Sequence, residues 1–384
     1  MKQRKIPAAF IRGGTSKAIV FHAKDLPAER AQWDAIFLSA IGSPDPYVRQ
    51  LNGMGGGVSS LSKVCVIGPP SHPDADIDYT FAQVQVKEAR VTYDINCGNM
   101  SSAMGPFAVD EGLVNVTGKE ALVRIHNTNT KKIIHARFPM DEGLAAVDGD
   151  LTIPGVTGTG AVVKLEFREP GGAGTGKLLP TGKVVDTLDV PGVGKIQVSM
   201  IDAANACAFI NAADIGLKGT EMPDELDASP DTLTKLDAIR TAASVAMGMA
   251  PNVEAAKKKS APFIGFVSPA QDAILLSGET LKGDSVDLTA RMMSNGQAHR
   301  ALPLTASLCI AVAARIEGSL VHAATRRNDD PEAPLRIAMP SGMLTVAASV
   351  HQHDGQWHAE QGALLRTQRR LFDGQVYVRD TRGQ

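Results

Sequence analysis

CGNMSSAMGPFAVDEGLV (97–114) and PLTASLCIAVAARIEGSLV (303–321) are the two segments that decide the fold. Both consist almost entirely of small and apolar residues, and they predict helices over 99–110 and 304–316 that have no polar face. A helix without a polar face is stable in a water-soluble protein only when it is buried. Each helix is therefore expected to lie inside a shell of strands.

A second pair of similar segments indicates an internal duplication. IRGGTSKAIVFHAKDL (11–26) and IDAANACAFINAADI (201–215) share an Ile, a small-residue turn, an apolar strand and an Ala-Asp-aliphatic ending. Two similarities in the same order favour two duplicated halves. We therefore predict domains at 1–182 and 183–384, joined near the Gly/Pro-rich stretch 170–182, and the last strands are expected to pack back on the first domain.

The remaining sequence is typical of an α+β fold. Amphipathic spacing predicts helices at 25–41 and 229–249, the second capped by Ser229. β-branched runs between Gly, Pro, Asn and Asp turns predict short strands at 19–21, 63–67, 79–86, 90–93, 121–126 and 132–138.

Composition and charge exclude several classes of protein. The 384 residues include 39 basic and 41 acidic side chains, so the chain lacks the basic excess of a nucleic-acid binder. The most apolar stretch, 301–314, is shorter than the roughly 20 residues of a membrane span. The N-terminus lacks the apolar run of a secretory signal. We expect a cytoplasmic protein without a nucleic-acid or membrane partner.

Three patterns that resemble cofactor or metal sites favour simpler interpretations. GGAGTGK (171–177) lacks the following Ser or Thr and the helix of a phosphate-binding loop, and it is interpreted as an inter-domain linker. An HQH-x4-H pattern is interpreted as a solvated strand face: His351, His353 and His358. Four cysteines without a CxxC pair predict reduced thiols: Cys65, Cys97, Cys207 and Cys309. No metal or other cofactor is expected.

Two short segments carry candidate reactive groups. NGMGGGVSSLSK (52–63) has four glycines in five residues, which let backbone N–H groups turn toward a ligand. It ends in Lys63 at the entry to an apolar strand, where a buried amine suits a base and a snorkelling surface lysine is the alternative. Cys97 immediately precedes a predicted helix, whose free N–H groups favour a thiolate or bind a carboxylate. A buried structural cysteine is the alternative for Cys97.

A series of motifs then resembles one family over nearly the whole chain. In order they are RGGTSK (12–17), SPDPY (43–47), GMGG with SSLSK (53–63), HPDADIDYTFAQV (72–84), NCGN (96–99), GPFAVDEGLV (105–114) and PTGKVVD (180–186). This set resembles the PrpF family, which includes 2-methylaconitate cis-trans isomerase, 3-methylitaconate Δ-isomerase and 4-oxalomesaconate tautomerase. The resemblance implies the diaminopimelate-epimerase-like fold. That fold has two pseudo-symmetric domains, each with a β-barrel-like sheet around a central α-helix, and an active site in the interdomain cleft.

The resemblance also implies residue roles. Lys63 matches the acid/base lysine of the SSxSK segment, and Cys97 matches the first of two cysteines that epimerases of this fold use. The second cysteine is replaced by Pro303, which disfavours a symmetric two-thiol racemase. We expect Cys97 either to carry a second proton or to contact the substrate. Donors to the substrate carboxylates are expected from both halves: Arg12, Ser16, Lys17, Ser59, Ser60, Gly98, Asn99, His299 and Thr305.

The expected function is cofactor-independent isomerisation of a small unsaturated di- or tricarboxylate by proton transfer. Acids of the methylaconitate or methylitaconate type rank first as substrates, and 4-oxalomesaconate tautomerisation ranks second. A diaminopimelate-type racemase and a non-catalytic binding protein of the same fold are the remaining alternatives. The expected partner is the carboxylate substrate, and a homodimer is the assembly to test.

Overall fold

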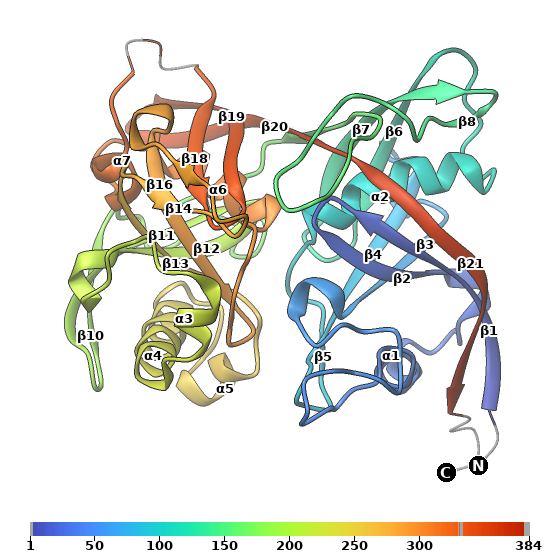
Figure 1. The fold of residues 1–384 in the computed structure, drawn as a ribbon, viewed down its shortest axis with the longest axis horizontal. Coiled ribbons are helices and arrows are strands. Elements are labelled where there is room, and N and C mark those ends of the chain that lie inside the picture. Colours follow the sequence, from blue (N-terminus) through green and yellow to red (C-terminus); the bar gives the residue numbers. More distant parts are fainter. Residues whose placement is uncertain (1–2, 329, 331–332, 380–384) are drawn as a thin grey trace. The chain divides into compact units, whose positions relative to one another are not determined.

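The computed structural model describes residues 3–328, 330 and 333–379, and the chain divides into two compact units (Figure 1). Unit 1 comprises residues 1–165 and 365–384, and unit 2 comprises residues 166–364. The division predicted after residue 182 rests on the sequence repeat rather than on contacts, and it stays a prediction. Two strands run across the limits of the units: β9 (Val163–Arg168) and β20 (Gln356–Arg366).

Unit 1 surrounds helix α2 (Gly98–Asp110) with strands, which α2 contacts on several sides (Figure 1). The strands pair in the order β1–β2 antiparallel, β2–β3 parallel, β3–β4 antiparallel, β4–β6 parallel and β6–β7 antiparallel. The C-terminal strand β21 pairs with β1. The strands are β1 (Gln3–Gly13), β2 (Ser16–His22), β3 (Lys63–Gly68), β4 (Ile77–Val84), β5 (Val91–Thr92), β6 (Glu120–Asn127), β7 (Lys132–Asp141), β8 (Leu144–Ala145) and β21 (Gln368–Arg379). The other helices are α1 (Trp33–Ile41), η1 (Ala23–Asp25), η2 (Arg30–Gln32) and η3 (Ser59–Leu61).

Unit 2 repeats this pairing order around helix α6 (Leu304–Ala313). The order is β11–β12 antiparallel, β12–β13 parallel, β13–β16 antiparallel, β16–β18 parallel and β18–β19 antiparallel. The duplication inferred from the sequence is therefore confirmed. The strands are β10 (Asp186–Val190), β11 (Gly194–Ala203), β12 (Asn205–Asn211), β13 (Phe263–Pro269), β14 (Ala273–Ile274), β15 (Thr280–Leu281), β16 (Leu288–Ser294), β17 (Gln297–Ala298), β18 (Leu335–Met339) and β19 (Gly342–His353). The other helices are α3 (Pro223–Asp227), α4 (Pro230–Ala246), α5 (Val253–Lys257), α7 (Leu320–Ala324), η4 (Ala212–Ile215) and η5 (Gly283–Ser285).

Both central helices are buried along almost their whole length, as their all-apolar composition predicted. Close packing around α2 depends on two glycines. A Cβ on Gly105 would lie 2.9 Å from the Cβ of Ala136 in β7, and a Cβ on Gly13 would lie 2.5 Å from the backbone oxygen of Asn99. Real Cβ atoms do not approach other atoms so closely, so both positions require glycine. Gly13 thereby lets the β1–β2 hairpin reach the start of α2.

The strands of unit 1 have two different buried faces, because successive side chains point to opposite sides of a sheet. Val64 and Val66 of β3 pack with Phe21 and Phe37 in a core on the α1 side. The residues between and before them, Lys63 and Cys65, therefore face α2.

The two amphipathic helices differ in how well the sequence located them. The segment 229–249 forms α4 after Ser229, as predicted, although the Ser229 hydroxyl donates to Thr232 Oγ1 and does not cap a backbone N–H. The prediction of a helix from residue 25 is wrong, because α1 begins at Trp33 after short 3-10 turns. Leu26 precedes Pro27 and is extended, and a residue before proline disfavours the helical conformation. No helix in the described part of the chain is long and apolar enough to cross a membrane.

Candidate active site

Lys63 is the first residue of β3 and faces α2 with only 6% of its surface exposed. Its Nζ donates a hydrogen bond of 2.6 Å to Oε1 of Gln83 and lies 4.9 Å from the centre of the Phe81 ring. Within the described residues, no Asp or Glu side chain pairs with this amine. A buried amine beside a neutral acceptor is an arrangement suited to a lysine that exchanges protons.

Cys97 is the residue that precedes α2, and it is connected to the strand of Lys63 by hydrogen bonds. Its backbone oxygen accepts a hydrogen bond of 3.4 Å from the Tyr79 hydroxyl. The Tyr79 hydroxyl in turn accepts a hydrogen bond of 3.8 Å from Sγ of Cys65. Burial raises the pKa of both Cys65 and Tyr79, so both groups stay protonated near neutral pH. Cys97 itself is 8% exposed, whereas Cys65 is fully buried.

A buried arginine, Arg366, contacts the first turn of α2. Gly98 and Asn99 are buried there, and Oδ1 of Asn99 accepts a hydrogen bond of 3.0 Å from Nε of Arg366. Arg366 is 4% exposed, and burial lowers its pKa to about 10, so it is cationic at neutral pH. No acidic side chain pairs with it among the described residues. A buried guanidinium beside the free N–H groups of a helix start is suited to bind a carboxylate.

Arg12 stands in a row of three cations across β2, β1 and β21. It lies directly opposite Lys17 on one neighbouring strand and Arg369 on the other. Its Nη1 donates to the backbone oxygen of Thr367 at 3.0 Å, and burial and then Arg369 lower its pKa. Lys17 Nζ lies 5.5 Å from the centre of the Phe10 ring, which belongs to the core on the α1 side. The structure therefore does not bring Lys17 to the face that carries Lys63.

The predicted serines are connected to the face of Lys63 by strand geometry or through Gln83. Ser16 is buried at the start of β2 and alternates with Lys17, so it is on the α2 face. Ser59 is buried and Ser60 is half-buried in η3. The backbone oxygen of Ser59 accepts a hydrogen bond of 3.0 Å from Nε2 of Gln83, the residue that holds Lys63.

The two remaining site residues lie in unit 2. Thr305 is the second residue of α6, and its buried Oγ1 accepts a hydrogen bond of 2.7 Å from Asn205. His299 is half-buried, its Nε2 is hydrogen-bonded to the Ser294 hydroxyl, and its ring centre lies 6.4 Å from that of Phe263. Both are therefore held by neighbours on the strands that precede α6.

Sequence reasoning missed two polar residues that contact the predicted site, Gln83 and Arg366. Gln83 stands in the alternating stretch FAQVQV, where the sequence gives no sign that it pairs with Lys63. Arg366 lies in a polar C-terminal stretch, far along the chain from Asn99. An alternating polar residue within an otherwise apolar strand is the signal that could have singled out Gln83.

The structure shows the surroundings of two segments that the sequence analysis interpreted without a cofactor. In GGAGTGK, the N–H groups of Gly174 and Thr175 donate to the buried carboxylate of Asp202, at 2.8 and 2.6 Å. A carboxylate therefore already occupies the donors that a phosphate would need, and the loop is anchored rather than a free linker. His351 and His358 are exposed and face each other across β19 and β20, as predicted for a solvated strand face. Within the described residues, no group of three or more His, Cys, Asp or Glu is arranged to hold a metal.

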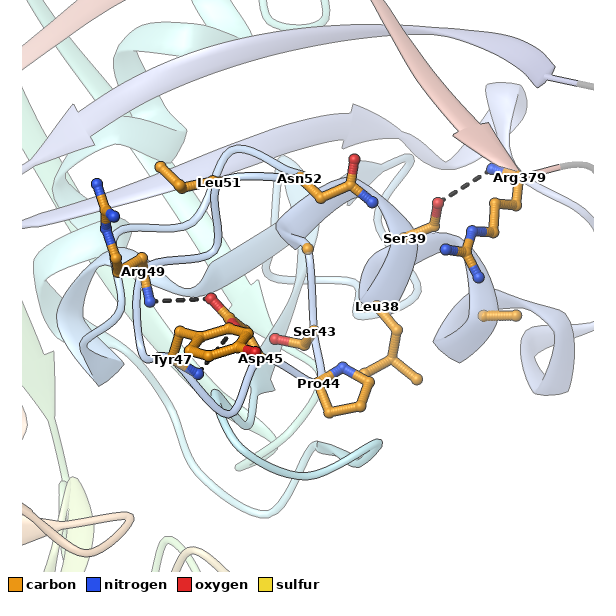
Figure 2. A pocket seen from close by; sticks show the side chains of 12 residues that line it. Leu38, Ser39, Ser43, Pro44, Asp45, Tyr47, Arg49, Leu51, Asn52 and Arg379 are labelled. Atoms are coloured by element: carbon orange, nitrogen blue, oxygen red, sulfur yellow. Dashed lines mark hydrogen bonds between the residues drawn. The ribbon is translucent and has the colours of Figure 1, made fainter.

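A pocket of about 690 Å3 opens beside α1 in unit 1 (Figure 2). Figure 2 shows Asp45 and Tyr47 of the SPDPY motif there, with the Asp45 carboxylate accepting the backbone N–H groups of Tyr47 and Arg49. None of the predicted site residues lines this pocket. Its loop is nevertheless connected to the site, because Gln50 donates to Ser43 Oγ at 2.9 Å and accepts from Ser62 Oγ at 2.8 Å.

Comparison with known proteins places the chain among isomerases. The 3-methylitaconate isomerase of Eubacterium barkeri is 44% identical over 379 residues, which cover 98% of each chain. The 2-methyl-aconitate isomerase of Cupriavidus necator is 40% identical over 390 residues, with the same coverage. The (4E)-oxalomesaconate Delta-isomerase of Novosphingobium sp. (strain KA1) is less similar, at 36% identity and 97% coverage of each chain.

The fold and the family agree with these relatives. A solved structure described as methylitaconate-delta-isomerase is 42% identical, has a TM-score of 0.77, and covers 98% of this chain and 96% of its own. The diaminopimelate-epimerase-like fold expected from the sequence is therefore confirmed. The family model described as PrpF protein matches residues 3–379. The chain belongs to the PrpF family, as the order of its sequence motifs predicted.

Proposed function

We propose that this protein is a cofactor-independent isomerase of a small unsaturated di- or tricarboxylate of the methylitaconate or methylaconitate type. The observation that carries the proposal is Lys63, a buried amine with an amide partner and no acidic partner among the described residues. The relatives at 44% and 40% identity support this substrate class. The lower similarity to the oxalomesaconate isomerase makes tautomerisation the second candidate.

In the proposed mechanism, the neutral amine of Lys63 removes a proton from an allylic carbon of the substrate. The C–H electron pair moves into the conjugated system and gives a dienolate, whose charge is stabilised by fixed hydrogen-bond donors. The ammonium then returns a proton to another carbon of the same allylic system, which restores the neutral lysine. Cys97 is proposed either to protonate that carbon in place of Lys63 or to contact the dienolate. In the first case the thiolate takes up a proton and the Lys63 ammonium loses one to solvent, which restores both groups.

We propose that a substrate carboxylate binds at the start of α2, between Arg366 and the N–H groups of Gly98 and Asn99. Arg366 is buried without an acidic partner among the described residues, so a bound carboxylate would supply the missing counter-charge. Arg12, Ser16, Ser59, Ser60 and His299 are retained as proposed substrate-binding residues. Thr305 is proposed to hold the start of α6, because its Oγ1 accepts a hydrogen bond from Asn205. Lys17 is not proposed as a substrate contact, because its side chain is on the α1 side. A cytoplasmic location is also proposed, because all four cysteines are free thiols in the structure.

Proton NMR in D2O tests the proposal with a small panel of acids. The panel contains 2-methylaconitate, 3-methylitaconate, cis- and trans-aconitate, and 4-oxalomesaconate. We expect deuterium to enter an allylic position of a methyl-substituted acid, together with a shifted double bond. Reaction of 4-oxalomesaconate alone would favour the second candidate. If no acid changed or exchanged, the proposed function would be wrong.

The remaining alternatives predict different results. A diaminopimelate-type racemase would exchange the α-proton of an amino acid, but Pro303 stands where such an enzyme needs its second cysteine. A binding protein of this fold would bind an acid saturably without any deuterium exchange, and it would have no need of the buried amine of Lys63.

A further inference from the structure

The contact between Lys63 and Gln83 is a buried, fixed bond between neighbouring strands. The two residues pair directly across β3 and β4, and their side chains meet at 2.6 Å between Nζ and Oε1. Gln83 is 1% exposed and Lys63 is 6% exposed. The ring of Phe81 covers the amine at 4.9 Å. Gln83 is therefore shielded from bulk solvent.

The amide of Gln83 has only one workable orientation. Its Nε2 donates to the backbone oxygens of Ser59 and Ser62, both at 3.0 Å. A rotated amide would set its oxygen against those two oxygens and its NH2 group against the amine of Lys63. Ser62 is fixed in turn, since its Oγ donates to Oε1 of Gln50 at 2.8 Å. The hydrogen bonds to Ser59 and Ser62 therefore fix the Gln83 oxygen that accepts from Lys63.

Among the described residues, no Asp or Glu side chain is paired with Lys63. Titratable side chains toward this face include Cys65 on β3, Tyr79 on β4 and Cys97 before α2. Burial raises the pKa of Cys65 and of Tyr79, which keeps both neutral. An amide oxygen accepts a hydrogen bond from an amine and from an ammonium alike, whereas a carboxylate would favour the ammonium.

We propose that Gln83 is a positioning residue that holds the Lys63 amine in place while leaving it free to gain and lose a proton. This inference rests on the proposed function, because it assumes that Lys63 is the acid/base group. One N–H of the neutral amine donates to Gln83, and the lone pair points elsewhere. The same bond persists after the proton is taken up, so the proton transfer requires no rearrangement of the protein at this contact.

Two substitutions separate this role from a purely structural one. Gln83→Glu keeps the size of the side chain but adds a negative charge that stabilises the ammonium. When kcat/KM is plotted against pH, the limb that rises as Lys63 loses its proton should therefore move to higher pH, by about one unit or more. Gln83→Leu removes the acceptor and leaves the amine in an apolar site, so the limb should move to lower pH. We also expect Gln83→Leu to lower kcat at least about tenfold, with a smaller change in KM. Gln85→Leu, at a glutamine that is also buried, is the matched control and should not move the limb.

A second measurement does not depend on turnover. Labelling of Lys63 with acetic anhydride across a range of pH, read by peptide mass spectrometry, gives the midpoint at which the amine becomes neutral. Midpoints that move in opposite directions in the Glu and Leu variants support the inference, even if no acid in the panel reacts with the wild-type protein. Midpoints that stay unchanged, or move together, overturn it, even if the wild-type protein is an active isomerase. If Gln83→Leu does not fold, the labelling midpoint of Lys63 in Gln83→Glu is the test. A midpoint at higher pH than in the wild type supports the inference, and an unchanged midpoint overturns it.

Discussion

The two units share one topology but place different chemistry at the same position. In unit 1 the residue opposite Ala18 across the parallel pair β2–β3 is Lys63. In unit 2 the residue opposite Cys207 across the parallel pair β12–β13 is Phe263. Both are the first residues of their strands. An amine in one unit therefore corresponds to an aromatic ring in the other.

The residues around Lys63 in unit 1 also differ from those around Phe263 in unit 2. Gln83 of unit 1 corresponds to Ser294 of unit 2, which is hydrogen-bonded to His299. The residue before the central helix is Cys97 in unit 1 and Pro303 in unit 2. Only unit 1 thus combines a buried amine with a thiol at the helix start. Duplication supplied two similar scaffolds, and we infer that proton transfer is concentrated on one of them.

What both units retain is the attachment of the central helix to the preceding hairpin. In unit 1, Asn99 of α2 donates to Thr15 Oγ1 at 3.0 Å. In unit 2, Asn205 beside the hairpin turn donates to Thr305 Oγ1 of α6 at 2.7 Å. The same Asn–Thr pair is used with its two members exchanged. A structural contact tolerates such an exchange. An acid/base position is more restricted, because its side chain must gain and lose a proton.

Lys63→Met should give the largest difference between the units. It removes the amine but keeps an unbranched apolar side chain, so we expect kcat to fall about 10²–10⁴-fold, the usual contribution of an acid/base group. Phe263→Met at the corresponding position of unit 2 is the matched control and should lose far less. Deuterium incorporation by NMR measures both variants. Equal losses at the two positions would contradict the asymmetry between the units.

Arg366→Met should have the next largest effect. Hydrogen bonds to a charged group contribute about 1.5–3 kcal/mol, so kcat/KM should fall roughly 10–100-fold, mainly through KM. An analogue that lacks one carboxylate should be affected much less by the substitution, since it lacks the group that Arg366 binds. Arg370→Met serves as control, because Arg370 already pairs with Glu111 at 2.8 Å. An equal loss for full and truncated substrates would show that Arg366 only supports the fold.

The sequence singled out the parts of the candidate site that depend on local pattern, and it missed contacts that depend on register. Cys97 stands next to a recognisable buried helix, and Lys63 opens an apolar strand, so both are visible in short segments. The pairing of Lys63 with Gln83 requires the register of two strands joined by a loop, which alternation alone does not set. Arg366 reaches Asn99 only because the end of the chain returns to unit 1. Long-range contacts of this kind leave no periodic signal.

Cys97→Ser and Cys97→Ala distinguish the two roles left open for the thiol. If Cys97 carries a proton, both variants should lose activity, and the loss should depend on pH, since a hydroxyl does not ionise in the same range. If it only contacts the substrate, Cys97→Ser should keep most of the activity and Cys97→Ala should lose somewhat more. We expect the second pattern, with a loss of about tenfold or less, because Lys63 already completes the proton cycle. A large, pH-dependent loss in Cys97→Ser would make the thiol a second proton carrier.

Thr305→Val should change the activity least, because it alters a contact that the units share rather than one in which they differ. The substitution keeps the shape of the side chain but removes the acceptor for Asn205, whose buried N–H then lacks this partner. Such a loss costs about 1–3 kcal/mol, so the free energy of unfolding in urea should fall by that amount. We expect kcat/KM to change only a few-fold, and Thr305→Ser should restore stability. A loss of activity as large as that of Arg366→Met, without loss of stability, would instead place Thr305 directly on a substrate carboxylate and make the binding of substrate, unlike the proton transfer, a task of both units.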